Sequence, residues 1–70
     1  DLMGMKTYPG MRVNVMMVKD DSQHTGTIYL VTDLYVDGEL WSDNYPRIKL
    51  DCGMTVEGLD CWWTPIEDAA

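Results

Sequence analysis

The side chains that could do chemistry in this chain of 70 residues are a single histidine, two cysteines and several carboxylates. A catalytic pair of a serine or cysteine with histidine would have to use His24, because the chain contains no other histidine. His24 ends a polar stretch and is far in sequence from Cys52 and Cys61. We interpret it as a solvated loop histidine and expect no nucleophile–base pair. The chain is therefore predicted not to be an enzyme.

Metal binding and acid–base catalysis receive little support from the residue spacing. His24 and the two cysteines could ligate zinc with an aspartate, but no C-x-x-C pair is present. Six methionines raise the alternative of copper(I) binding, yet Met11 and Met17 alternate with valines as core residues do. The paired carboxylates Asp20 and Asp21 are expected in a solvated loop. We predict neither a metal nor another cofactor.

Cys52 and Cys61 are nine positions apart, one at a predicted turn and one at a predicted corner, so they could approach each other. No basic stretch followed by an apolar run precedes them, as a secretory signal would require. We therefore expect a cytoplasmic location and free thiols, since thiols stay reduced in that compartment. Whether the two are bonded is left open by the sequence.

The aromatic residues are the strongest functional signal. The chain has three tryptophans, four tyrosines and no phenylalanine, and a core this small cannot bury them all. Trp62 and Trp63 are adjacent, so on extended backbone only one of them can point inward. Exposed aromatic rings beside acidic residues suit cations, arginine- or lysine-bearing peptides, or a symmetric partner subunit. We predict that the partner-binding residues are Tyr35, Trp41, Asp43, Tyr45, Trp62 and Trp63.

The charge balance limits the kinds of partner. Twelve Asp and Glu against five Lys and Arg give a net charge of −7. Binding to nucleic acid or to an anionic membrane needs a basic face, so both are disfavoured. No stretch is apolar and long enough for a transmembrane helix. The charge favours a basic protein partner, with the alternative that it only keeps the domain soluble.

Hydrophobic alternation with a period of two residues predicts an all-β fold. Strands are expected over 11–18 and 25–36, the second being the longest, with a bulge or a bend at Gly26. Asp37-Gly38 predicts a tight hairpin turn. The return strand is interrupted at 42–44 by a wide bulge or a loop. The predicted core comprises Val13, Val15, Met17, Ile28, Leu30, Ile48, Leu50, Val56 and one of the two adjacent tryptophans.

The stretch from Tyr45 to Trp63 predicts a second hairpin that runs into a compact corner. Its turn is expected at 51–53, closed by Gly53 in the left-handed region. A 3₁₀ turn is expected within 59–64, before a short closing strand at 65–67 where an edge position tolerates Pro65. The domain is expected to span 8–67, with a disordered segment at 1–7 and a frayed end at 68–70.

The order of these elements resembles the small SH3-like barrels. The resemblance is carried by GMRVNVM in the first strand, GTI opening the second, the RIKLDCGMTVEG hairpin, and a tryptophan-bearing corner followed by TPIED. The chain looks most like stand-alone KOW- or Tudor-like barrels of bacteria and phages. The resemblance implies a five-stranded barrel that binds partners, with a groove shared by the loops at one rim and the last short helix.

One SH3-like family, the plasmid-type dihydrofolate reductase, is an enzyme. It carries a Val-Gln-Ile-Tyr stretch, whereas the comparable positions here read Arg47-Ile48-Lys49-Leu50. We therefore expect a non-catalytic protein-binding module that acts as a small regulatory or inhibitory partner of another protein. The alternative is a structural subunit whose aromatic patch is buried in its own homo-oligomer. Trp41 is expected in the binding groove, with core packing as the alternative for that residue.

Overall fold

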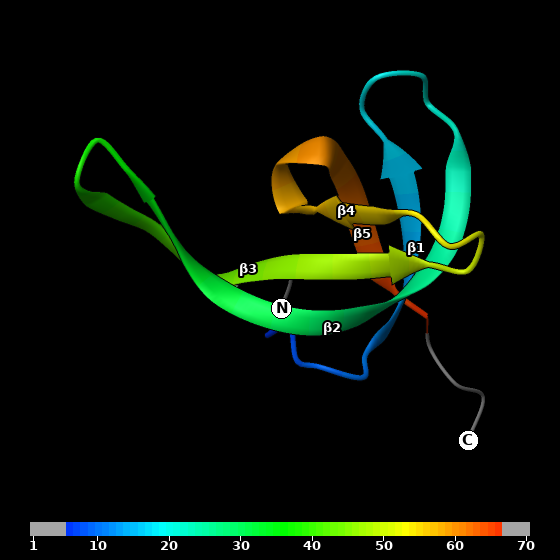
Figure 1. Ribbon diagram of the computed structural model, residues 1–70, viewed down its shortest axis with the longest axis horizontal. Helices are drawn as coiled ribbons and strands as arrows, with labels where there is room; N and C mark the ends of the chain where they lie inside the picture. Colours follow the sequence, from blue (N-terminus) through cyan, green and yellow to red (C-terminus); the bar gives the residue numbers. More distant parts are fainter. Residues whose placement is uncertain (1–5, 67–70) are drawn as a thin grey trace.

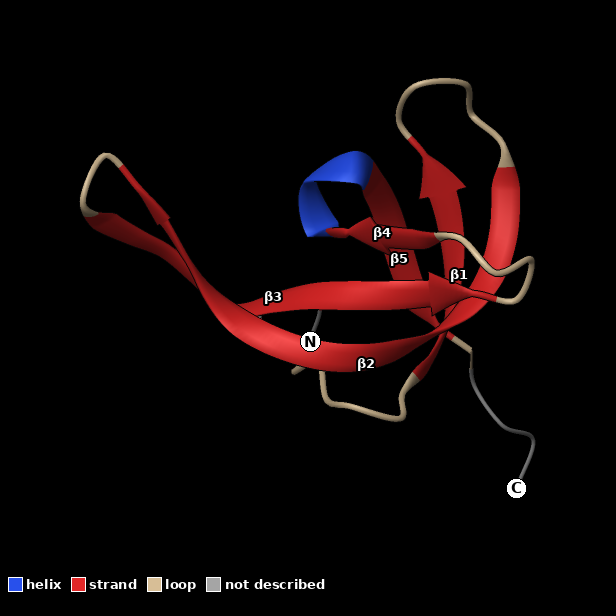
Figure 2. Ribbon diagram, viewed as in Figure 1, coloured by secondary structure: helices blue, strands red, loops and turns tan. Residues whose placement is uncertain are grey.

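The structure, a computed structural model, describes residues 6–66. Its elements are β1 (Arg12–Met17), β2 (Gln23–Val36), β3 (Glu39–Leu50), β4 (Thr55–Glu57), the 3₁₀ turn η2 (Gly58–Asp60) and β5 (Cys61–Pro65). The all-β prediction is confirmed (Figure 2). Residues 1–5 of the segment predicted to be disordered at 1–7, the predicted frayed end at 68–70, and Glu67 of the predicted closing strand lie outside the described residues.

The five strands form one antiparallel sheet in the order β4-β3-β2-β1-β5. The sheet curls strongly (Figure 1), and in the described part of the chain β4 and β5 do not pair with each other. β4 and β5 are therefore the two ends of an open sheet in the described part of the chain. The turn η2 connects these two ends directly.

The core lies inside the curl. In β1 the predicted alternation is confirmed, because Val13, Val15 and Met17 are buried while Arg12 and Asn14 are exposed. Burying these apolar side chains is the main favourable contribution to folding. Of the residues predicted for the core, all the aliphatic ones except Leu30 are buried; the buried hydrophobic cluster is Met11, Val13, Val15, Met17, Ile28, Ile48, Leu50, Val56 and Cys61.

The prediction that Leu30 is a core residue is wrong, since its side chain is 43% exposed. Ile28 pairs with Ile48, whereas Leu30 pairs with Arg47, so β2 has one extra residue at Tyr29. A bulge of one residue shifts the alternation of side chains along a strand. Beyond the bulge it is therefore Val31 that packs against the core.

β2 is the longest strand, as predicted, because it serves two neighbours. Residues 23–27 pair with β1, and the pairing with β3 begins at Gly26. A Cβ atom on Gly26 would lie 2.7 Å from the Lys49 carbonyl oxygen, so only glycine fits this close approach. The register is regular at Gly26, which makes it the predicted bend and not a bulge.

Beyond the core, β2 and β3 continue as a two-stranded ribbon, which we call the hairpin arm (residues 32–44; left in Figure 1). Its predicted turn is confirmed: Asp37 and Gly38 have φ angles of 51° and 82°, as a type I′ turn requires. Thr32 pairs with Tyr45 and Leu34 with Ser42, so β3 has one extra residue here. The predicted interruption at 42–44 is thus a bulge within a continuous strand.

The second predicted hairpin turn is also confirmed. Gly53 has a φ angle of 102°, and its N–H donates to the Leu50 carbonyl oxygen over 2.9 Å. Asp51 and Cys52 complete the turn between β3 and β4. A glycine at this position accepts the left-handed conformation at little cost.

The C-terminal corner differs from the prediction in its order. The 3₁₀ turn is at Gly58–Asp60, and both tryptophans lie in β5 with Pro65 at its end. The Asp60 carboxylate accepts a hydrogen bond of 3.1 Å from the Glu57 N–H. This bond stabilises the turn at 58–60, ahead of the tryptophans. Trp63 packs against the core, whereas Trp62 is exposed, as extended backbone requires.

Candidate functional site

A groove of about 400 Å³ separates the hairpin arm from the C-terminal corner. Its walls come from the first half of β3, the end of β2, the turn η2 and strand β5, with Thr7 at one end. Segments far apart in sequence meet here because the sheet curls. The residues that line the groove are Thr7, Leu34, Trp41, Ser42, Asn44, Tyr45, Gly58, Leu59, Trp63 and Thr64.

Three of the six predicted binding residues line this groove, namely Trp41, Tyr45 and Trp63. The other three predicted residues, Tyr35, Asp43 and Trp62, are exposed outside its lining. The structure therefore brings the aromatic rings of β3 and β5 together, which the sequence alone could not do. Leu34, Leu59 and the polar lining residues were not singled out from the sequence, because their proximity depends on the curl of the sheet.

Tyr45 forms a fixed wall of the groove, since only 6% of the residue is exposed. Its hydroxyl donates a hydrogen bond of 2.8 Å to the Glu57 carboxylate and accepts one of 3.2 Å from the Leu59 N–H. Burial, with a contribution from Glu57, raises the pKa of the Tyr45 hydroxyl. A Cβ on Gly58 would lie 2.9 Å from the ring, so glycine is needed behind it. The strand pattern pointed to an aromatic binding residue here, but not to its burial.

Trp41 and Leu59 are the exposed apolar side chains of the groove. Trp41 is 67% exposed, so it does not pack on the core, which was the alternative for this residue. Leu59 is exposed to a similar degree and lies in η2. Large exposed apolar side chains that line the same open groove are typical of a binding surface.

Two hydroxyl side chains hydrogen-bond to the backbone of Asn44 at the rim of the groove. Thr7 donates to the Asn44 carbonyl oxygen over 3.0 Å, and the Asn44 N–H donates to the Ser42 hydroxyl over 3.0 Å. Among the described strands none neighbours this part of β3 on its outer side, because β4 pairs only with residues 47–49. The side chains thus satisfy backbone groups that the bulge leaves free.

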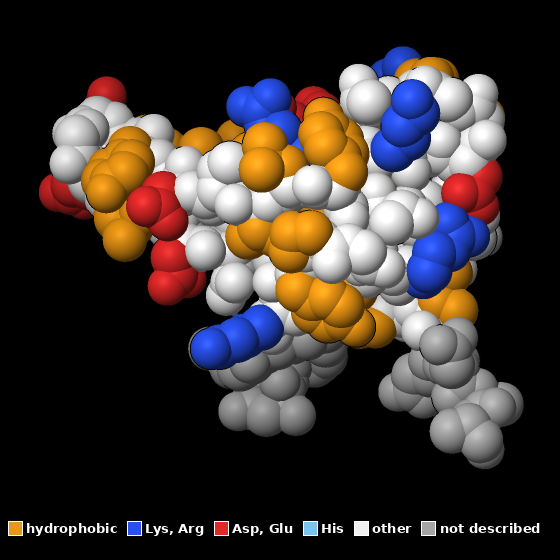
Figure 3. All heavy atoms as spheres, turned by 60° about the horizontal axis from the view of Figure 1, so that its bottom comes forward, with side chains coloured by type: hydrophobic (Ala, Val, Ile, Leu, Met, Phe, Trp, Pro, Cys, Tyr) orange, Lys and Arg blue, Asp and Glu red, His pale blue; other side chains and the backbone are white. Residues whose placement is uncertain are grey.

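The hairpin arm is acidic. It carries Asp33, Asp37, Glu39 and Asp43, and the chain has no lysine or arginine between residues 20 and 46. Acidic side chains border hydrophobic ones at this end of the molecule (left in Figure 3). Clustered charges of one sign raise the local concentration of oppositely charged partners. The electrostatic field on the arm side of the groove therefore favours cations.

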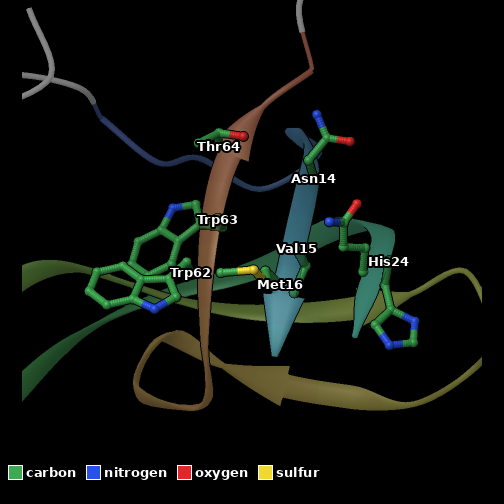
Figure 4. A pocket seen from close by; sticks show the side chains of 8 residues that line it. Asn14, Val15, Met16, His24, Trp62, Trp63 and Thr64 are labelled. Carbon is green, nitrogen blue, oxygen red and sulfur yellow. The ribbon is translucent and has the colours of Figure 1, made fainter. Parts of the chain in front are cut away.

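Trp62 belongs to a second hollow, of about 270 Å³, on the outer face of β5, β1 and β2 (Figure 4). Met16 pairs with Trp62 across the strands, and its side chain extends toward the indole. His24 lines the same hollow, within β2 and not in the predicted loop, and its Nε2 is 3.0 Å from the Ser22 hydroxyl. The hollow is separate from the groove but shares Trp63 and Thr64 with it.

The two cysteines differ in their surroundings, and the buried one, Cys61, is poorly placed to act as a nucleophile. Both are free; Cys52 is exposed in a turn and Cys61 is buried. Burial raises the pKa of the Cys61 thiol to about 11, and its sulfur lies 3.6 Å from the Glu57 carbonyl oxygen. Among residues 6–66, no three His, Cys, Asp or Glu side chains are grouped closely enough to hold a metal ion.

Comparisons of the chain with protein-family models, curated proteins and solved structures find no match. Within the described residues, no helix has the length and apolar character needed to cross a membrane.

Proposed function

We propose that this protein is a non-catalytic binding module that holds a basic segment of a partner protein in the groove between the hairpin arm and η2. The observation that carries this proposal is the convergence of Trp41, Tyr45 and Trp63 beside an arm that has acidic side chains and no basic ones. Because the proposal gives this domain a binding surface and no catalytic activity, we assign it a small regulatory or inhibitory role toward the partner.

The chemistry of the groove supports a lysine or arginine side chain as the recognised group. An exposed indole attracts a cation through its electron-rich face, which contributes about 0.5–2 kcal/mol depending on desolvation. Trp41 presents such a face, and Asp43 lies two residues away on the same strand. The acidic arm would speed encounter with a basic partner, while Leu59 would contact the aliphatic part of the bound side chain.

We further propose that the open, curled sheet is a small SH3-like barrel of the KOW or Tudor kind, working in the cytoplasm. The 3₁₀ turn η2 before β5 and the groove beside it support this assignment. In such barrels the rim loops and the last short helix share a binding groove. The fold by itself does not specify a ligand, so the chemistry of the groove residues defines the partner.

A second candidate function is a structural subunit of a homo-oligomer. It is favoured by the face of the arm that points away from the groove, where Tyr35 and Leu40 form an exposed cross-strand pair. An isolated two-stranded ribbon with apolar side chains on it is marginally stable in water. Packing of this pair against another subunit would bury it. Light scattering distinguishes the two candidates, because only the second requires a stable oligomer.

The proposed groove is tested with the variants Trp41→Ala and Trp62→Ala, which remove side chains of equal exposure, 67% and 68%. The probe is a peptide of alternating arginine and threonine, followed by tryptophan fluorescence. Losing a central aromatic anchor costs at least about 2 kcal/mol, so Trp41→Ala should weaken binding more than tenfold. Trp62→Ala should bind as the parent does, and both should keep the parent melting temperature.

Two results would contradict the proposal. Unchanged affinity in both variants would show attraction by net charge alone, without a groove. A melting temperature that falls sharply only in Trp41→Ala would assign that ring to the core. A pull-down from the source cell with the parent and Trp41→Ala as baits would then identify the natural partner, as the protein retained by the parent only.

A further inference from the structure

In the part of the chain that the structure describes, β5 is the last strand of the sheet, and only one of its two edges is paired. The bonds at its ends define which residues face β1. The Ile66 N–H donates to the Arg12 carbonyl oxygen over 3.0 Å, and the Asp60 carbonyl oxygen accepts from the Val18 N–H over 3.0 Å. Ile66 and Asp60 therefore direct these backbone groups toward β1.

The direction of the backbone groups between these two residues follows from antiparallel pairing. In such a pair, every second residue of a strand bonds to the neighbouring strand. Trp62 and Thr64, which pair with Met16 and Asn14, are in the same phase as Asp60 and Ile66. Cys61, Trp63 and Pro65 are in the opposite phase, so their backbone groups point away from β1. Pro65 has no N–H to leave unpaired, which explains why this phase accepts a proline.

The free edge of β5 borders the groove. Trp63 and Thr64 belong to the groove lining, opposite the side formed by Trp41 and the rim of β3. The edge is five residues long and ends in a proline, which are two features that limit uncontrolled pairing with other chains. Among residues 6–66 no strand pairs with this edge, so the Trp63 N–H and C=O can meet a ligand that lies along the groove.

We propose that the basic segment binds as an extra β-strand on the outer edge of β5, hydrogen-bonding to the backbone of Trp63. Alternate side chains of such a strand point to opposite faces, so every second one would reach toward Trp41 and the acidic arm. The main chain would supply affinity, and a lysine or arginine at alternate positions would supply specificity. This inference rests on the proposed function, which it extends to the conformation and spacing of the ligand.

The occupant is a basic partner and not a second copy of this chain. A second β5 would arrive with the acidic residues that flank it, Glu57 and Asp60, because the chain has no lysine or arginine after Lys49. It would meet the acidic arm of the first copy, and like charges brought together at an interface oppose binding. A strand with alternating cations has the opposite charge and meets no such penalty.

Amide hydrogen exchange tests the inference residue by residue, using the alternating arginine–threonine peptide. On saturation with the peptide, exchange at the Trp63 N–H should slow more than tenfold. The Trp62 and Thr64 N–H groups already bond to β1 and should change less than about twofold, which makes them internal controls. Unchanged exchange at Trp63 in a saturated complex would overturn strand addition.

Backbone N-methylation of the peptide gives an independent measurement. In the added strand, every second N–H of the peptide would face β5, and methylating those N–H groups should weaken binding more than tenfold. Methylating the alternate N–H groups, which face away from β5, should leave the affinity within about twofold. Equal affinities for both methylated peptides, with Trp41 fluorescence still responding, would exclude the added strand but keep the groove. Absence of any Trp41-dependent binding by the unmethylated peptide would instead reject the proposed function.

Discussion

The body of the molecule and the hairpin arm are built from the same two long strands, yet they differ in almost every property that stabilises a fold. In the body, Ile28 of β2 and Ile48 of β3 pair and are fully buried. In the arm, Tyr35 and Leu40 of the same strands pair and are largely exposed. The difference lies in what covers the ribbon, since β1, β4 and β5 pack only over its body.

This contrast shows that strand pattern and structural role are separate properties. β-branched and aromatic residues favour extended structure along the whole length of β2. Only those residues that meet a second layer of the curled sheet contribute to a core. An uncovered two-stranded ribbon with exposed aromatic side chains is marginally stable on its own, so its apolar surface is available to the binding role proposed above.

Truncating one aliphatic side chain in each region tests most directly whether the body and the arm differ in their contribution to stability. Ile48→Ala removes a side chain with no exposure, whereas Leu40→Ala removes one that is 52% exposed. Core truncations of this kind cost about 2–5 kcal/mol, and exposed ones stay within about 0.5 kcal/mol. Urea denaturation should therefore show a large drop in the free energy of unfolding for Ile48→Ala only. A comparable loss in Leu40→Ala would mean that the arm is covered in solution.

A smaller effect distinguishes the two regions through their glycines. Gly26→Ala in the body places a Cβ 2.7 Å from a backbone oxygen, and overpacking of this kind costs about 1–3 kcal/mol. Gly38→Ala in the arm meets nothing within 4 Å, and its cost comes only from the φ angle of 82°, about 1 kcal/mol. Thermal unfolding should rank Gly26→Ala as the less stable variant. The reverse order would show that the arm turn governs the unfolding of the whole domain.

The sequence predicted local features in both regions and missed an irregularity in the body. Local alternation identified Val13, Val15, Ile48 and Leu50 as buried, because each strand segment there has one dry face. The Asp37-Gly38 turn was equally predictable, since its chemistry is contained within two residues. Leu30 was misplaced because a bulge, which no local pattern announces, shifts the alternation by one residue.

The candidate site was predicted in its chemistry but not in its geometry. Trp41 and Trp63 were recognisable as aromatic rings that a small core cannot bury entirely. Their meeting across a groove depends on the curl of the sheet and on the position of η2, which place residues from β3 and β5 together. The free edge of β5 was not predictable for the same reason, as strand order is a property of the whole chain.

The smallest expected effect on stability comes from a polar cluster in the body, which has no counterpart among the described contacts of the arm. On the outer face of the body, the Arg12 guanidinium forms two hydrogen bonds to the Asp51 carboxylate, of 2.7 and 2.8 Å. The Thr25 hydroxyl donates to the same carboxylate over 2.6 Å. These contacts, chiefly those from Arg12, hold the pKa of Asp51 well below its usual range. The cluster joins β1, β2 and the turn after β3, so it stabilises the body specifically.

A carboxylate whose pKa is lower in the folded than in the unfolded chain stabilises the fold above the unfolded value, about pH 4, and loses that contribution as pH falls further. Asp51→Asn should therefore melt below the parent at pH 7, with a modest difference because the pair is half-exposed. The two melting temperatures should converge as the pH is lowered from 4 toward 2. As a control at pH 7, Asp43→Asn, in the arm, should melt with the parent, because among the described residues this exposed carboxylate forms no ion pair. A constant gap between Asp51→Asn and the parent would show that the carboxylate acts by its shape and not by its charge.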